Sequence, residues 1–448
     1  MSDVFIGALT MLGCVVLIQT GMHIGVALMF LSFAGVLGMR GVEVAGKLLA
    51  RSAATSIASD AYGVIPLFVL MGLFVSATNM GRDTFDVAAL LLKRLRGGLA
   101  MATVGANAVF AACTGTSIAS ASIFTKIAVP EMVRYGHTTW FSVGVVAGSS
   151  VLGMLIPPSI LFIIFGVIAN VSIGDLFTAG ILPGVVLAVA FCITISLLAY
   201  FRPGFVFVDP KTVRHGEYTG PLQDAPAWSV ALKFAPICIL VGIVLGGIYG
   251  GLFTPIEAGG TGALAAFLIA LLRKELTLKV FWQVALETGR VTAAICFLLM
   301  AAQMYSQMLT LSGLPYAVGQ WLQSSGLSFL VILAGYLIVV LIMGCFLDSV
   351  SIMLILLPFV LPVMDGFGIN LVWFGVITVI AIEIGLLTPP LGVSVFVVKA
   401  NLDDQRITTW DIFMGAMPMT LTMCFILVVC VVFPWLSLTL IGQRWSWW

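Results

Sequence analysis

The chain has very few charged residues. Asp, Glu, Lys and Arg make up 9% of its 448 residues, while 61% are hydrophobic. A soluble domain carries about 25% charged residues, so this composition cannot cover a soluble surface. The net charge of +1 says nothing about nucleic acid, but the sequence has no basic tract with interleaved aromatic residues, so we expect no nucleic-acid binding. The composition therefore predicts a polytopic membrane protein, with apolar runs long enough to span a bilayer.

Motifs for enzymatic and metal chemistry are also missing. The sequence has no CxxC pair, no Cys/His cluster and no HExxH, GxSxG or GxGD motif. Its eight cysteines stand singly in apolar segments, where we expect small buried hydrophobic residues. We therefore expect no enzyme, no cofactor and no transition-metal site. The start, MSDVF, lacks the basic region of a cleaved signal peptide, so residues 4–20 are predicted to be a retained span.

A repeated pair of prolines is the most informative feature that is present. Pro157-Pro158 lies in GMLIPPS (153–159), and Pro389-Pro390 lies in GLLTPPL (385–391), 232 residues further along. The same offset pairs Gly81 with Gly313, Cys113 with Cys345, Ser117 with Ser349, and Pro130 with Pro362. One gapless register over this distance indicates an internal duplication in which each half carries one broken helix. Such a pattern is typical of secondary transporters.

Apolar stretches predict five full spans in each half. They lie near 4–20, 23–39, 62–79, 138–170 and 180–201, and then near 231–250, 256–272, 284–311, 370–399 and 412–440. Two further stretches, 99–133 and 330–364, are too long for one span and have polar centres, CTGTS (113–117) and CFLDS (345–349). We expect both to be re-entrant hairpins with the polar tip at mid-membrane. Non-helical backbone is tolerated there only inside protein or beside a water-filled cavity.

An odd number of spans per half requires the second half to be inverted in the membrane. We expect a first inverted repeat at 1–201, a cytoplasmic linker at 202–230 and a second inverted repeat at 231–448. Basic residues agree, because cytoplasmic loops carry an excess of Lys and Arg. Fourteen lie on the side of the linker: Arg82, Lys93, Arg94, Arg96, Arg134, Arg202, Lys211, Arg214, Lys233, Arg273, Lys274, Lys279, Lys399 and Arg406. Four lie opposite, namely Arg40, Lys47, Arg51 and Arg444, so the loop 40–51 is the exception.

The tips and the breaks together predict ion sites. Proline removes a helical donor and frees carbonyl oxygens, and hard cations are held by oxygens. One tip supplies Thr116 and Ser117, and the other supplies Asp348 and Ser349. Helix N-termini at tips and breaks favour a carboxylate. The sequence thus predicts two cation cages with an anion cradle between them.

Glu383 is a second acid at apparent membrane depth, six residues before Pro389. Ionisable groups at that depth are costly and by default functional. Two interpretations stay open for it. Glu383 either takes part in the site or is a structural carboxylate that braces the unwound segment.

Six motifs carry a resemblance to a known family. They are GTSIASA (115–121), VPEM (129–132), GMLIPPSILFIIFG (153–166), SIGDLFTAGILPG (172–184), GLFTPIEAG (251–259) and EIGLLTPPLG (383–392). The set resembles the large membrane subunit of tripartite ATP-independent periplasmic (TRAP) transporters, the DctM-like family, over essentially the whole chain. The resemblance implies an all-α, ion-transporter-superfamily-like fold with an elevator-type transport domain and scaffold. It also implies a sodium-driven symporter in a bacterial or archaeal inner membrane, importing an organic anion.

The resemblance implies partners and site residues as well. The partners are a small four-helix DctQ-like subunit, expected as a separate chain, and a DctP-like periplasmic binding protein. The expected sodium ligands are Gly115, Thr116, Ser117, Ser149, Ser150, Gly153 and Pro157 in one half, and Asp348, Ser349, Gly385, Thr388 and Pro389 in the other. The expected anion contacts are Thr116, Pro158, Ser159, Asp348, Pro390 and Gly392. A dicarboxylate, a keto acid and a sugar acid all remain open as substrates.

Other functions remain to be weighed against this one. The nearest alternative is a stand-alone sodium–dicarboxylate symporter of related architecture, which would need no binding protein. A channel would lack strict coupling of solute to sodium. A membrane-embedded enzyme is disfavoured by the missing catalytic motifs.

Overall fold

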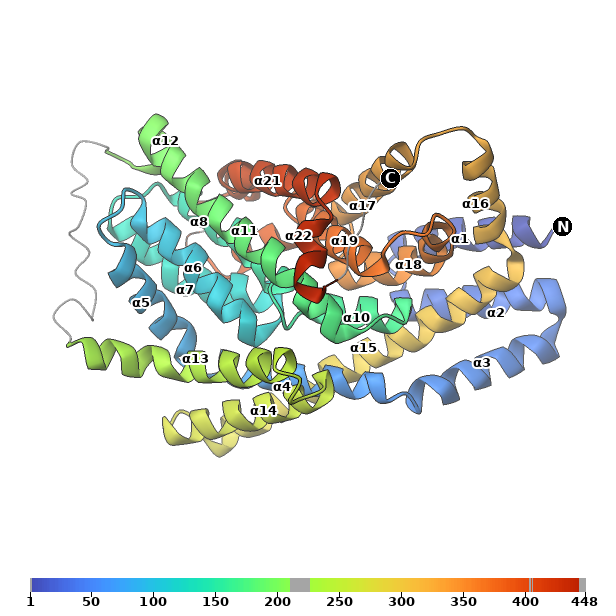
Figure 1. The fold of residues 1–448 in the computed structure, drawn as a ribbon, viewed down its shortest axis with the longest axis horizontal. Coiled ribbons are helices and arrows are strands. Elements are labelled where there is room, and N and C mark those ends of the chain that lie inside the picture. The colour runs from blue at the N-terminus through green and yellow to red at the C-terminus, as the bar shows by residue number, and fades with distance from the viewer. Residues whose placement is uncertain (1, 210–225, 403, 405, 443–448) are drawn as a thin grey trace.

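The computed structural model describes residues 2–209, 226–402, 404 and 406–442. Its regular structure in those ranges is helical throughout (Figure 1). Five of the described helices are long and apolar enough to cross a membrane, and up to seven spans result if each bent helix pair counts as one. The prediction of an all-helical, polytopic membrane protein is therefore confirmed. Of the predicted linker, residues 210–225 lie outside the described ranges.

The first half contains the hairpin and the broken helix expected from the sequence, together with helices that hydropathy missed. Its elements are α1 (Asp3–Gln19), α2 (Ile24–Arg40), α3 (Val42–Ile57), η1 (Asp60–Gly63), α4 (Val64–Ser76), α5 (Met80–Leu92), α6 (Gly98–Thr114), α7 (Ser117–Arg134), α8 (Thr139–Ser150), α9 (Leu152–Leu155), α10 (Ile160–Ala169), α11 (Ile173–Phe201) and α12 (Pro203–Val206). The prediction of a loop at 40–51 is wrong, because helix α3 begins at Val42 and covers most of this stretch. Gly41, at a φ of +87°, makes the turn from α2 into α3.

The second half repeats this order. Its elements are α13 (Ala227–Tyr249), α14 (Pro255–Leu272), α15 (Leu278–Ser312), α16 (Leu314–Ser324), α17 (Phe329–Gly344), α18 (Ser349–Asp365), α19 (Leu371–Gly385), α20 (Val393–Ala400), α21 (Thr409–Val432), α22 (Trp435–Leu438) and η2 (Thr439–Ile441). The span predicted at 412–440 is too long, since α21 ends at Val432 and Pro434 precedes a short separate helix.

Helix boundaries follow the 232-residue offset closely. Helix α7 begins at Ser117 and α18 at Ser349, while α8 begins at Thr139 and α19 at Leu371. The pairs α6–α7 and α17–α18 form the two hairpins. In Figure 1 the α6–α7 pair lies towards the left, whereas the α17–α18 pair lies right of the centre, beside α19, and α1, α2 and α16 form the right-hand end.

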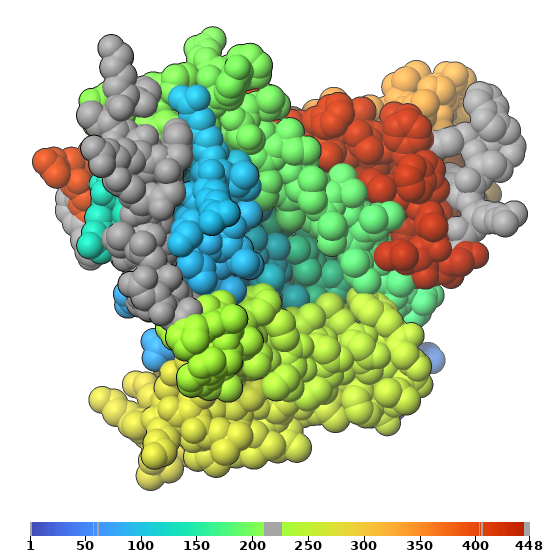
Figure 2. Space-filling view, turned by 60° about the vertical axis from the view of Figure 1, so that its left-hand side comes forward, coloured from blue at the N-terminus to red at the C-terminus, as the bar shows by residue number. Residues whose placement is uncertain are grey.

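A separate layer of helices lies along one side of this body. Helices α13 and α14 run beneath α5 and α11 in Figure 2, and α15 extends from them towards α1 and α2 in Figure 1. With 35 residues, α15 is about 52 Å long, well beyond the roughly 30 Å hydrocarbon core of a bilayer. Helices α4 and α2 pack against this layer and connect it to the first half.

Buried charges hold α5 to this layer. Arg273 Nη2 lies 2.5 Å from Asp83 Oδ2, and Lys233 Nζ lies 3.3 Å from Asp83 Oδ1. Lys233 also lies 3.8 Å from Asp86 Oδ2. Both aspartates are buried, and removing one partner of a buried pair leaves an uncompensated charge. Helix α5 is therefore fixed to α13 and α14 just before the chain enters the first hairpin.

Helices α8 and α21 cross at a pair of glycines. A Cβ at Gly144 would lie 2.0 Å from the carbonyl carbon of Gly415, and a Cβ at Gly415 would lie 1.9 Å from the carbonyl oxygen of Trp140. No side chain fits such a gap, so only glycine at both positions allows the two backbones to touch. The broken helix of the first half is thereby locked to the last long helix of the second.

We predict that Gly144→Ala lowers the melting temperature of the detergent-solubilised protein. Overpacking of a tight contact costs about 1–3 kcal/mol. The matched control is Gly289→Ala on α15, where an added Cβ meets no atom within 4 Å. That control should melt at the same temperature as the wild type or slightly higher, because alanine restricts the unfolded chain. Equal melting temperatures for both variants would contradict the close crossing.

Candidate functional site

The first hairpin tip lies directly against the first helix break. The backbone is unwound from Ile156 to Ser159, and the Pro157–Pro158 bond within it is cis. The N–H of Ile160 donates to the carbonyl oxygen of Gly115 at 3.3 Å, so the tip pairs a backbone group at the end of the break. Gly115 has a φ of +62°, and a Cβ there would lie 2.6 Å from the carbonyl oxygen of Pro158. Glycine is thus required for this approach.

Two hydroxyls complete the backbone pairing around this break. Ser159 caps α10 by accepting from the N–H of Phe162, and its hydroxyl donates to the carbonyl of Met154 at 2.5 Å. Thr116 caps α7 by accepting from the N–H of Ala119 at 3.3 Å. These bonds explain how a broken helix is tolerated where water does not reach the freed backbone groups.

Two of the expected sodium ligands lie before the first break. Helix α8 continues through Ser149 and Ser150, and α9 adds another turn, so only residues 156–159 are unwound. Ser150 donates to the carbonyl of Ala147 at 2.8 Å. Ser149 accepts a 2.6 Å bond from Asn107 Nδ2 on α6. Both serines therefore belong to the helix that leads into the break.

The second tip lies against the second break through two glycines. Helix α19 ends at Gly385, and residues 386–392 carry the chain to α20, with a cis bond at Pro389–Pro390. A Cβ at Gly385 would lie 2.6 Å from Gly344 Cα, at the end of α17. Gly153, the equivalent of Gly385 in the first half, is equally tight, since a Cβ there would lie 2.6 Å from the carbonyl oxygen of Thr116. Each break is therefore built to receive a tip.

The two halves differ in exposure. Pro157, Pro158 and Ser159 are buried, and the space between them and α4 is too small for a water molecule. Pro389 and Pro390 are exposed, as is Asp348 at the second tip. Of the predicted anion contacts, Asp348 and Pro390 are exposed in this conformation, whereas Gly392, Pro158 and Ser159 are buried.

Several predicted ligands already have protein partners. Asp348 caps α18 by accepting from the N–H of Ser351 at 3.2 Å, and it also accepts from the Ser351 hydroxyl. The hydroxyl of Thr388 donates to the carbonyl of Ile384 at 2.8 Å. A Cβ at Gly392, which has a φ of +57°, would lie 2.7 Å from the ring of Phe413. These residues are at the predicted places, and the bonds hold the tip and the break in shape.

Glu383 brings the two tips together. Its side chain is buried, and Oε1 accepts a 3.0 Å bond from the hydroxyl of Ser349, the first residue of α18. The side chain of Ser117, the first residue of α7, approaches the same carboxylate. Oε2 has no hydrogen-bond partner among the described residues. The acid flagged by the sequence thus lies between Ser117 and Ser349, which are equivalent under the offset.

Two buried side-chain hydrogen bonds were not predicted from the sequence. Asn107 on α6 bonds Ser149 on α8, and Tyr336 on α17 bonds Thr378 on α19 through a 3.0 Å contact between hydroxyls. In each half the bond joins the first hairpin helix to the helix that leads into the break, and in each the partners are 42 residues apart. An equal spacing of buried polar residues in both halves was the signal that could have revealed them.

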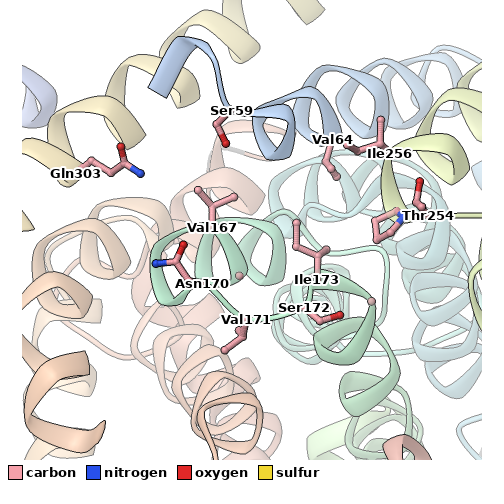
Figure 3. Close-up of a pocket in the computed structure, with 13 residues that line it drawn as sticks. Ser59, Val64, Val167, Asn170, Val171, Ser172, Ile173, Thr254, Ile256 and Gln303 are labelled. Atoms are coloured by element: carbon pink, nitrogen blue, oxygen red, sulfur yellow. The ribbon is translucent and has the colours of Figure 1, made fainter. Parts of the chain in front are cut away.

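A larger cavity lies away from the tips, about one helix length beyond the first break. It has a volume of about 490 Å³, is open on one side, and is lined by the end of α10, the starts of α4, α11 and α14, and α15 (Figure 3). Its polar side chains are uncharged, namely Ser59, Asn170, Ser172, Thr254 and Gln303. Ser172 and Thr254 already cap α11 and α14. The cavity separates the α13–α15 layer from α10 and α11, and it has no charge to select an anion.

Comparison with known proteins places these features in context. Residues 11–436 match the family model "Tripartite ATP-independent periplasmic transporter, DctM component". The C4-dicarboxylate TRAP transporter large permease protein DctM of Pseudomonas aeruginosa is 33% identical, with 84% of this chain and 85% of that one covered. The isethionate TRAP transporter permease protein DctMQ of Oleidesulfovibrio alaskensis is 32% identical, with 81% of this chain and 56% of that one covered.

A solved structure has a similar fold. The crystal structure of the YdaH transporter of Alcanivorax borkumensis superposes with a TM-score of 0.60 over 90% of this chain and 91% of that one. The two sequences are only 14% identical, so this likeness concerns the fold alone.

We predict a coupled loss of stability at the Asn107–Ser149 pair. Ser149→Ala leaves a buried amide without its partner, which should destabilise the protein by about 1–3 kcal/mol. Adding Asn107→Leu to Ser149→Ala should cost much less than the sum of the two single changes, because neither polar group is then left unpaired. A thermal-denaturation double-mutant cycle measures this coupling. Additive effects would mean that the bond does not form.

Proposed function

The chain belongs to the DctM-component family of TRAP transporters, whose members are transporter permeases and not enzymes, and we propose from this that it is a sodium-driven importer of an organic anion. It is a multi-pass protein of a bacterial TRAP system. In the proposal it lies in the inner membrane and receives the anion from a periplasmic binding protein. A small DctQ-like subunit completes the complex.

The pairing of each hairpin tip with a helix break carries this proposal. Each pair gathers carbonyl and hydroxyl oxygens and places the start of a long helix, α7 or α18, beside them. Such oxygens suit sodium, and helix N-termini suit a carboxylate or sulfonate. Sodium is held by the tips and breaks, at Gly115, Thr116, Ser117, Gly153 and Pro157 and at Asp348, Ser349, Gly385, Thr388 and Pro389. Ser149 and Ser150 support the first set from the helix below it.

The transported anion binds between the tips in this proposal. No Arg or Lys occurs in residues 115–117, 156–159, 345–348 or 386–392, so its charge is offset by helix N-termini and by bound sodium. Relatives are named for C4-dicarboxylate and for isethionate, a sulfonate, which supports a small organic anion as the class. Accessible Pro390 and Asp348 lie on the open side. Pro158, Ser159 and Gly392 frame the site through the backbone.

The movement in the proposal is that of an elevator. The two halves are inverted repeats, and the hairpins and broken helices move together against the layer formed by α13, α14 and α15. Three observations support this movement. Helix starts repeat at an offset of 232 residues, α8 crosses α21 in close contact, and the Asp83–Arg273 ion pair holds α5 against α14. The cavity of Figure 3 lies at the boundary between the two bodies.

Uptake into proteoliposomes that hold this chain and its small partner tests the function. Radiolabelled C4-dicarboxylates, keto acids, sugar acids and sulfonates are supplied with and without the binding protein, under an inward sodium or potassium gradient. Uptake that needs both sodium and the binding protein supports the proposal. Uptake without the binding protein favours the stand-alone symporter, and uptake that ignores sodium contradicts sodium coupling.

We predict that Asp348→Asn raises the sodium concentration needed for half-maximal uptake at least severalfold. Asparagine caps a helix about as well as aspartate, so this change removes the charge and keeps α18 in place. The matched control is Asp365→Asn at the exposed end of the same helix. A wild-type sodium titration in Asp348→Asn, at equal protein level, would remove Asp348 from the site.

Pro389→Ala is expected to lower uptake, because alanine restores a backbone donor and allows helix to re-form across the break. The control is Pro362→Ala, an exposed proline within α18. Initial uptake rates measure both variants. Transport at the wild-type rate in Pro389→Ala would show that the second break is not needed.

A further inference from the structure

The carboxylate of Glu383 has an oxygen that the described protein leaves unsatisfied. The side chain is 1% exposed, and only Oε1 is hydrogen-bonded, to the hydroxyl of Ser349. The described residues offer it no ion pair with Lys, Arg or His. A buried charged group without a partner costs several kcal/mol, so something other than these side chains must compensate Glu383.

The hydroxyls that contact the Glu383 carboxylate, and the carboxylate itself, come from three helices. Ser349 opens α18, Ser117 opens α7, and Glu383 lies in α19 two residues before Gly385. Ser120, one turn further along α7 and on the same helix face as Ser117, is also buried, and its hydroxyl has no partner. One carboxylate and nearby hydroxyls are the donor set that a hard cation takes.

We propose that Glu383, Ser117 and Ser349 hold an additional sodium ion at the point where the two hairpin tips meet. This inference rests on the proposed sodium-driven transport and adds a site to it. The two predicted cages each belong to one half, whereas this ion is shared by both. Its positive charge compensates the negative charge of the buried carboxylate.

The donors also indicate which ion is bound. No group of three or more His, Cys, Asp or Glu side chains that would suit a metal ion occurs among the described residues, so the soft or imidazole ligands of a transition metal are not gathered here. A single carboxylate with neutral hydroxyls matches a monovalent cation better than a divalent one, because one negative charge is then fully offset. Residue 151, the equivalent of Glu383 in the first half, is Val, so the site occurs once.

A shared ion has a mechanical consequence. It adds a shared centre to the contacts that Ser349 and Ser117 already make with Glu383, so α7, α18 and α19 are held together more firmly when it is bound. Movement of the hairpins as one body then depends on sodium, even before the anion arrives. This would prevent the empty or half-loaded protein from crossing between its two conformations.

The test compares Glu383→Gln with wild type in the complex that contains the small partner and the binding protein. Glutamine keeps the shape and still accepts from Ser349, but it carries no charge. The number of sodium ions moved per anion is measured from the reversal potential of uptake, and binding of radioactive sodium is measured without anion. We expect Glu383→Gln to move one sodium fewer per anion. Glu287→Gln, an exposed carboxylate on α15, should leave the number unchanged.

Each outcome of this test either supports or refutes the additional sodium site. An unchanged sodium number in folded Glu383→Gln overturns the inference, as does a variant that loses only its pH dependence, since Glu383 would then bind a proton. If Glu383→Gln does not fold, Glu383→Asp replaces it, because aspartate keeps the charge but shortens the side chain. A weaker sodium affinity in that variant supports the site, and wild-type affinity refutes it. Sodium-independent uptake by the wild-type complex would instead reject the proposed function itself.

Discussion

The freed backbone of two broken helices is the constraint on which the rest of the structure depends. An unpaired backbone group away from water costs several kcal/mol, so each break must lie against something that pairs or shields it. In the first half, Gly115 supplies a carbonyl to Ile160, and Ser159 bonds the carbonyl of Met154. A re-entrant hairpin that reaches the break meets this need. The same contact collects the oxygens of the proposed ion site.

Close backbone approach and polar anchoring together position the hairpins. Gly153 and Gly385 let the tips touch the breaks without a side chain between them. Asn107–Ser149 and Tyr336–Thr378 then fix the hairpin depth from further down the helices. The two halves nevertheless differ, because the first break is packed under α4 and the second is open. Such a difference is consistent with the proposed inverted repeats, in which the two halves would face opposite sides of the membrane in turn.

Much of this arrangement could be predicted from the residue pattern, and the failures have physical reasons. The doubled prolines and the polar tips identified both hairpins and both breaks. Helices α3 and α5 were missed because hydropathy finds only apolar runs, and α3 carries Glu43, Lys47 and Arg51. The Asn107–Ser149 bond and the place of Glu383 between the tips depend on packing between helices, which no local pattern contains. Ser149 and Ser150 were expected among the sodium ligands from the family resemblance, but both lie in α8, before the break.

A cryo-EM structure of the complex in high sodium with its transported anion tests the central claim most directly. The account predicts density for the anion between the two hairpin tips, beside the accessible second break, with sodium at the tips and breaks around it. Anion density in the uncharged cavity between α10 and α15, with no ion near either Pro-Pro pair, would contradict it.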